Sequence, residues 1–175
     1  MATPGELGPF ADRRLRFAAA LGDALAIIPG AQEARRNGDV SYEFRQSSDF
    51  FFLTGFDEPD AVAVINPAHA KERYVLFVRP RDREMEVWTG HRAGVEGAVA
   101  TYGADAAYPI DRLDDKLREY LIDRPVVYYR LGQVAFDGRV TRLVTELRGA
   151  RARGYPTPVR LEDPGPILHE MRLRR

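Results

Sequence analysis

The chain has 175 residues, with 26 Lys and Arg, 26 Asp and Glu, 3 His and no Cys, and 45% of its residues are hydrophobic. That length suits one domain with a sizeable core, and that hydrophobic content excludes wholesale disorder. The lack of Cys excludes a disulfide scaffold, a thiol nucleophile and a Cys-ligated metal centre. The zero net charge argues against bulk electrostatic binding of nucleic acid.

Membrane and export signals are also missing from the sequence. No segment approaches the roughly 20 apolar residues that a membrane span needs, and no basic region followed by an apolar one stands at the N-terminus. We therefore expect a cytoplasmic chain with no membrane partner and no nucleic-acid partner.

The first third of the chain predicts two helical segments around one strand. Apolar spacing predicts a helix over 9–21, with Pro9 in its first turn, and then a short buried strand over 24–28. Residues 31–46 are polar and show no period, so we expect a long loop there. A capped helical turn is expected over 47–53.

The middle of the chain predicts strands. Apolar runs at 61–65 and 74–78 and an alternating segment at 84–89 indicate three strands. Their short connections favour antiparallel neighbours.

The remainder alternates between helix and strand. Helices are expected over 95–102, over 111–121 with Asp111 as the N-cap, over 136–147 and over 167–175, and a strand is expected over 126–129. Asp114 and Asp115 are interpreted as solvated charges on the second of these helices. The whole pattern predicts an α/β fold with a mixed, partly antiparallel sheet flanked by helices.

The sequence offers no catalytic motif of its own. The histidines, His69, His91 and His169, are far apart and form no metal-ligand spacing. The serines lie outside a nucleophile elbow, and the glycines at 90, 94 and 97 do not match a phosphate-binding loop. We therefore expect neither catalytic residues nor metal ligands in this chain.

Two stretches are nonetheless unusual. The segment 42–56 is far richer in aromatic residues than the chain average of 10%. It is interpreted as a core-filling turn in which Arg45 and Asp49 form a local ion pair. The segment 86–92 holds the only Trp, Trp88, which is either an interface or ligand contact or a packing residue.

These stretches, taken in order, resemble the N-terminal domain of the Xaa-Pro aminopeptidase (aminopeptidase P) family. The strongest pieces are R-Q-x-S-D-F at 45–50 and T-G-F-x-E-P at 54–59. Further pieces are Val75-Leu76-Phe77, Arg79, Arg81-Asp82, Glu86-Val87-Trp88-Thr89-Gly90, Arg92 and His169-Glu170-Met171-Arg172. The resemblance extends from about Arg13 to Arg175.

The resemblance implies that catalysis takes place outside this chain. In that family a following domain holds two divalent metal ions, usually manganese, which activate the water that attacks the bond before a Pro in position two. The N-terminal domain forms oligomer contacts, giving a dimer or tetramer, and restricts access to the active site. We accordingly expect residues 1–160 to be this domain and 161–175 to be a linker and the start of an absent peptidase domain.

The resemblance also implies three site residues. Trp88 matches a Trp that reaches a neighbouring subunit's active site and lines the substrate pocket. Asp39 matches an Asp that pairs with an Arg of the peptidase domain, and Arg153 matches an Arg close to the same network. The ordinary alternatives are a packing Trp, a solvated loop acid and a surface Arg.

Other functions stay open on the sequence. The chain could be a stand-alone module that has lost the peptidase domain and uses its aromatic cluster and Trp88 to bind peptides or proteins. It could also be the N-terminal domain of a prolidase or a creatinase, although R-Q-x-S-D-F favours the aminopeptidase.

Overall fold

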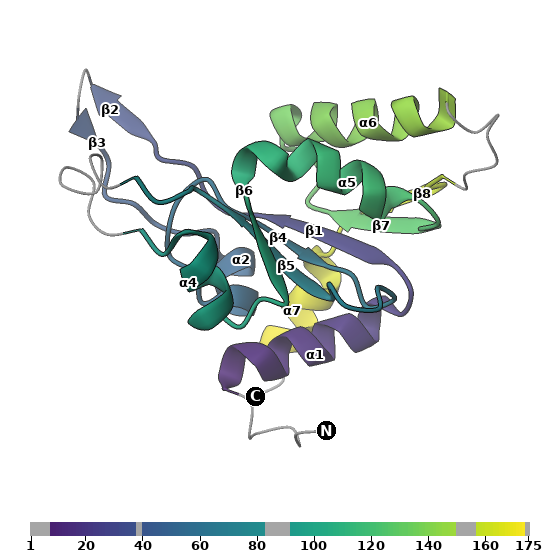
Figure 1. Cartoon of the computed structure of the whole chain (residues 1–175), viewed down its shortest axis with the longest axis horizontal. Coiled ribbons are helices and arrows are strands. Elements are labelled where there is room, and N and C mark those ends of the chain that lie inside the picture. The colour runs from purple at the N-terminus through teal and green to yellow at the C-terminus, as the bar shows by residue number, and fades with distance from the viewer. Residues whose placement is uncertain (1–7, 38–39, 83–91, 150–156, 174–175) are drawn as a thin grey trace.

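The continuous apolar runs of the sequence form the centre of a six-stranded sheet that has helices on both faces (Figure 1). The structure is a computed structural model and describes residues 8–37, 40–82, 92–149 and 157–173. The first half of these residues holds α1 (Pro9–Leu21), β1 (Leu25–Pro29), β2 (Arg35–Asn37), β3 (Val40–Ser41), α2 (Ser48–Thr54), β4 (Val62–Ile65) and β5 (Tyr74–Val78). The second half holds α4 (Gly94–Ala100), β6 (Ala106–Pro109), the 3-10 turn η1 (Ile110–Arg112), α5 (Leu113–Leu121), β7 (Val126–Tyr129), α6 (Val134–Gly149), β8 (Arg160–Glu162) and α7 (Gly165–Leu173).

The strand order of the large sheet is β6-β5-β4-β1-β7-β8. Strand β4 runs antiparallel to both of its neighbours, β1 and β5, whereas the pairs β1–β7, β5–β6 and β7–β8 are parallel. The remaining five strands therefore share one direction. The prediction of an α/β fold with a mixed, partly antiparallel sheet is confirmed.

The central strands are buried on both faces, which is why they are apolar at every position instead of alternating. On one face, Ile28, Ile65 and Leu76 pack with Phe17 of α1, Phe50 of α2 and Leu168 of α7. On the other face, Ile27, Val64 and Phe77 pack with Leu117 of α5 and Leu143 of α6. Figure 1 shows α5 and α6 on one side of the sheet and α1, α2 and α7 on the other.

Three predictions of secondary structure differ from the structure. Residues 31–46 are not one loop, because β2 and β3 pair within them as an antiparallel hairpin. Asp111 does not cap α5: it lies inside η1, and α5 begins at Leu113 after Arg112. Strands β6 and β8 were not expected, because both are short and no residue of either is fully buried. The expected strand over 84–89 lies outside the described residues.

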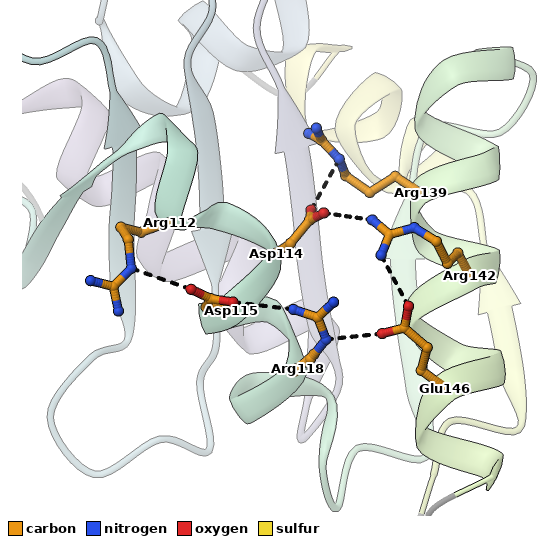
Figure 2. A network of polar contacts seen from close by, with 7 residues as sticks. All are labelled: Arg112, Asp114, Asp115, Arg118, Arg139, Arg142 and Glu146. Atoms are coloured by element: carbon orange, nitrogen blue, oxygen red, sulfur yellow. Dashed lines mark hydrogen bonds and ion pairs between the residues drawn. The ribbon is translucent and has the colours of Figure 1, made fainter.

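A network of ion pairs joins α5 to α6 on the outer surface (Figure 2). Asp114 contacts Arg139 and Arg142, and Arg118 bridges Asp115 and Glu146, with Arg118 Nε 2.9 Å from a Glu146 oxygen. Asp114 is therefore paired across the two helices, Asp115 pairs with Arg118 of its own helix, and neither is merely a solvated charge. Because the network is exposed, it is screened by salt and adds little to stability.

A partly buried cluster of polar side chains around Glu72 connects the β4–β5 loop to α5. The Glu72 carboxylate accepts hydrogen bonds from the hydroxyl of Tyr108, at 2.6 Å, and from that of Tyr120. The Lys116 ammonium lies over both rings. Burial alone would raise the pKa of Glu72, but the two hydroxyls and the nearby Lys116 outweigh it and lower that pKa.

Replacing Glu72 with Gln is expected to lower the free energy of unfolding by about 1–2 kcal/mol at pH 7, because charged acceptors strengthen both hydrogen bonds. The folded-state pKa of Glu72 is depressed, so its contribution is present above the ordinary carboxyl pKa and is lost as the pH falls below it. Urea unfolding at several pH values should show the gap between wild type and Glu72→Gln closing in acid. Glu96→Gln, on the exposed side of α4, is the control. A gap that stays constant with pH would contradict the assignment.

Candidate functional site

Loops from distant parts of the sequence meet at the carboxyl edge of the sheet. The chain leaves β1 through Gly30 and Ala31 and enters the antiparallel strand β4 through Asp60 and Ala61 at this same edge. The Gly30 N–H donates to Ala61 O at 2.8 Å, and the Asp60 N–H donates to Ala31 O at 3.1 Å. Ligands of open α/β sheets bind outside the carboxyl ends of the strands, so this edge is the candidate functional site.

Gln46 is the central residue of this edge. Its Oε1 accepts the N–H of Ala31 at 2.6 Å and that of Ser47 at 2.9 Å. Its Nε2 donates to the carbonyls of Phe56, at 3.3 Å, and Glu58, at 2.8 Å. The side chain is buried. One amide of R-Q-x-S-D-F therefore connects the exit of β1, the start of α2 and the segment T-G-F-x-E-P.

The approach of Gln46 requires glycine at position 30. A Cβ on Gly30 would lie 3.0 Å from Ala61 O and 3.0 Å from Gln46 Oε1. These distances are shorter than ordinary contacts, so a larger residue would push the amide or the β4 backbone away.

Glu58 fixes the chain at the start of α4. Its Oε1 accepts the Ala93 N–H at 2.7 Å, while its Oε2 is buried with no hydrogen-bond partner among the described residues. Next to Ala93, Gly94 has φ +63°, and a Cβ there would lie 2.5 Å from the Arg81 stem. Arg81 and Gly94 therefore bring together the two described ends that flank residues 83–91.

The three residues that the resemblance assigns to the site, Asp39, Trp88 and Arg153, all lie outside the described residues. Asp39 belongs to the connection between β2 and β3, and Trp88 belongs to the connection between Arg81 and Gly94. Glu58 contacts Ala93, close to the second of these connections, and Gln46 holds the carbonyl of Glu58. The sequence contained both, inside its two strongest motif pieces, but local patterns gave them no role because their partners are 10 or more residues away, apart from Ser47.

Asp49 pairs with distant arginines and not with Arg45. The carboxylate is buried and contacts Arg130, which follows β7, at 2.8 Å, and also Arg172 of α7. The expected local pair of Arg45 and Asp49 is therefore wrong. Asp49 instead fastens the last described helix to α2.

A crevice of about 680 Å³ opens at this edge, between the exit of β1 and the start of α6. Its polar side chains include Gln32, Asp60 and Arg139, and its apolar wall includes Ile110 and Phe136. At its rim Val134 is 86% exposed, so part of the apolar surface here faces solvent.

The described residues hold no group of three or more His, Asp or Glu side chains that could bind a metal ion. His69 instead organises a turn, because its Nδ1 accepts the N–H of Glu72 at 2.8 Å. His169 is exposed on α7. None of the helices that the structure describes has the length and hydrophobicity of a membrane span.

Comparison with known proteins identifies the family. The family model described as "Aminopeptidase P, N-terminal domain" matches residues 10–128. The chain belongs to this family. The resemblance seen in the sequence is thus confirmed, and the chain is an N-terminal domain of the Xaa-Pro aminopeptidase type.

Relatives of this aminopeptidase P domain are longer proteins. The Xaa-Pro aminopeptidase of Escherichia coli is 36% identical over 150 residues, which are 85% of this chain but 34% of that protein. The structure of the aminopeptidase PepP of Pseudomonas aeruginosa is 40% identical with a TM-score of 0.90, over 98% of this chain and 39% of the other. The Zn-substituted Escherichia coli aminopeptidase P in complex with product is 34% identical with a TM-score of 0.88, over 95% of this chain and 39% of the other. The chain therefore spans about a third of the length of the curated relative.

Proposed function

We propose that this chain is the non-catalytic N-terminal domain of a Xaa-Pro aminopeptidase that forms oligomer contacts and lines the substrate path to a peptidase domain. That domain would remove the first residue of peptides that have Pro in position two. The proposal includes a domain boundary near residue 160, with 161–175 leading into the peptidase domain, a dimer or tetramer as the assembly, and a cytoplasmic location.

The arrangement around Gln46 and Glu58 is the observation that carries the proposal. The two side chains tie the exit of β1, the start of α2 and the start of α4 into one edge. A surface that shapes a substrate path must hold its contact residues in a fixed geometry. The buried hydrogen bonds of Gln46 and the contact of Glu58 with Ala93 would provide such a fixed geometry.

Roles follow for the three residues on this proposal. Trp88 would supply an aromatic wall to the substrate pocket of a neighbouring subunit. Asp39 would pair with an arginine of the peptidase domain, and Arg153 would belong to the same network. As in the family, two divalent ions, expected to be manganese, would be held by the peptidase domain.

The decisive experiment uses the complete reading frame that contains this chain and a Xaa-Pro peptide as substrate. Replacing Trp88 with Ala is expected to lower kcat/KM by about tenfold or more, because an aromatic wall positions the substrate. Val159→Ala, an exposed apolar residue beside β8, is the control and should leave kcat/KM unchanged. The 175-residue chain alone with Mn²⁺ should release no product.

Three results would overturn the proposal. Cleavage by the chain alone would show that catalysis lies within it. An unchanged kcat/KM for Trp88→Ala would remove the role in substrate access. A reading frame without a metal-binding domain would favour the stand-alone peptide-binding or protein-binding module.

A further inference from the structure

A second hollow lies at the opposite edge of the sheet, away from the candidate site. It has a volume of about 550 Å³ and lies between α1 and the residues that flank β5. We call it the α1 groove. Its size falls within the range of small-molecule sites, about 300–1,000 Å³.

One wall of the α1 groove is apolar. Ala11, Leu15, Ala18 and Ala19 line it from α1, and Ile65 lines it from the end of β4. Leu15 is 51% exposed, although leucine on an amphipathic helix is normally turned into the core. The wall therefore presents apolar surface that the described residues leave uncovered.

Arg14, also from α1, brings its guanidinium to the lining of the groove. Its NH1 donates to Leu53 O at 3.0 Å, and its Cζ lies 4.0 Å from the centre of the Tyr74 ring. A guanidinium has five N–H donors, so one hydrogen bond to the described protein leaves most of them for a ligand. Burial lowers the pKa of Arg14, yet arginine remains charged at physiological pH.

The Tyr74 hydroxyl lies buried beside the groove without a hydrogen-bond partner among the described residues. The residue is 6% exposed. Buried polar atoms nearly always find a partner in folded proteins. Because burial raises the pKa of this hydroxyl, it stays protonated and able to donate.

The charges that line the groove favour an anion. Arg14 and Arg73 are cationic, and Asp105 is the one acid among the described residues that lines the groove with them. Oδ2 of Asp105 is already occupied, since it accepts the N–H groups of Arg73 at 3.0 Å and of Tyr74 at 2.7 Å. An apolar wall beside an excess of donors matches a molecule with one charged end and one apolar end.

We propose that the α1 groove binds a small carboxylate with an apolar body, its carboxylate on Arg14 and its body against α1. A free aliphatic acid and the C-terminus of a short apolar peptide share this chemistry. The proposal goes beyond the substrate-path function and does not depend on it, because the groove lies at the other edge of the sheet.

The test is an NMR titration of the 175-residue chain with sodium hexanoate, followed on the amides of Ala18, Ala19 and Gly103. We expect saturable shifts, and binding about tenfold weaker for hexylammonium and for 1-hexanol, because only the carboxylate pairs with Arg14. N-acetyl-leucyl-leucine and its C-terminal amide form the peptide arm. A preference for the free dipeptide acid over hexanoate identifies peptide C-termini, and the reverse identifies free acids. Both support the proposal.

Substitutions distinguish the effect of the Arg14 charge on binding from an effect on folding. Arg14→Gln should weaken hexanoate binding about tenfold. Arg16→Gln, an exposed arginine of the same helix that pairs with Asp12, should leave binding unchanged. Should Arg14→Gln unfold, Leu15→Asn tests the apolar wall without touching the core and should also weaken binding.

Four outcomes would overturn the proposal. The first is the absence of saturable shifts at millimolar hexanoate, and the second is equal binding of hexanoate, hexylammonium and 1-hexanol. The third is unchanged binding by both Arg14→Gln and Leu15→Asn. The fourth is a dimer in sedimentation whose formation, in the NMR spectrum, shifts these same amides.

Discussion

Replacing Gln46 with Ala is expected to lower the free energy of unfolding by about 3–5 kcal/mol. The N–H groups of Ala31 and Ser47 would lose their acceptor. The carbonyls of Phe56 and Glu58 would lose their donor. A buried polar group that loses its partner costs about 1–3 kcal/mol, and water entering the vacated space would recover part of the loss. The effect is large because one side chain serves four backbone groups.

Guanidinium chloride unfolding followed by circular dichroism measures this effect. Gln32→Ala is the matched control, because Gln32 is an exposed amide at the same edge, and its effect should stay within about 0.5 kcal/mol. Gln46→Glu keeps an acceptor for Ala31 but turns a carboxylate toward two carbonyl oxygens, so it should also destabilise. A loss below about 1 kcal/mol for Gln46→Ala would show that water replaces the amide without penalty.

The buried strands and helices could be predicted from the sequence alone. The apolar runs at 61–65 and 74–78 predicted β4 and β5 because strands buried on both faces must be apolar at every position. Helical spacing predicted α1 and α5 because one stripe of each helix faces the sheet. Burial thus leaves a local pattern, and that pattern can be recognised without a structure.

Edge strands leave no such pattern. Residues 106–109 and 160–162 are incompletely buried and take their strand conformation from β5 and β7, with which they pair. The hairpin of β2 and β3 is likewise defined by pairing between its two short strands. For these segments, the partner's hydrogen-bonding groups decide the structure, and the partner is distant in sequence except within the hairpin.

Long-range ion pairs are equally hidden. The sequence placed Arg45 beside Asp49 because the two are four residues apart, a common spacing for helical pairs. The fold instead brings Arg172 to Asp49 across 123 residues. The motif pieces contain Gln46, Asp49 and Glu58. Only the folded structure shows which backbone groups and charged side chains these three residues contact.

The contact of Asp49 with Arg172 bears on where this domain ends. Beside it in α7, Leu168 is fully buried against the face of the sheet that α1 and α2 also cover, and Ile167 and Met171 pack around it. The boundary at residue 160 stays a prediction, but α7 shares a hydrophobic core with α1 and α2.

Leu168→Ala is therefore expected to destabilise the 175-residue chain by about 3 kcal/mol, the usual cost of removing a buried leucine side chain and leaving a cavity. His169→Ala is the matched control, because the neighbouring side chain on the same helix is exposed and should change stability by less than about 0.5 kcal/mol. Urea unfolding should show a single transition that shifts as a whole with Leu168→Ala. If α7 does not belong to this domain, Leu168→Ala will leave the midpoint of the unfolding transition unchanged. In that case α7 belongs with the linker and the start of the peptidase domain.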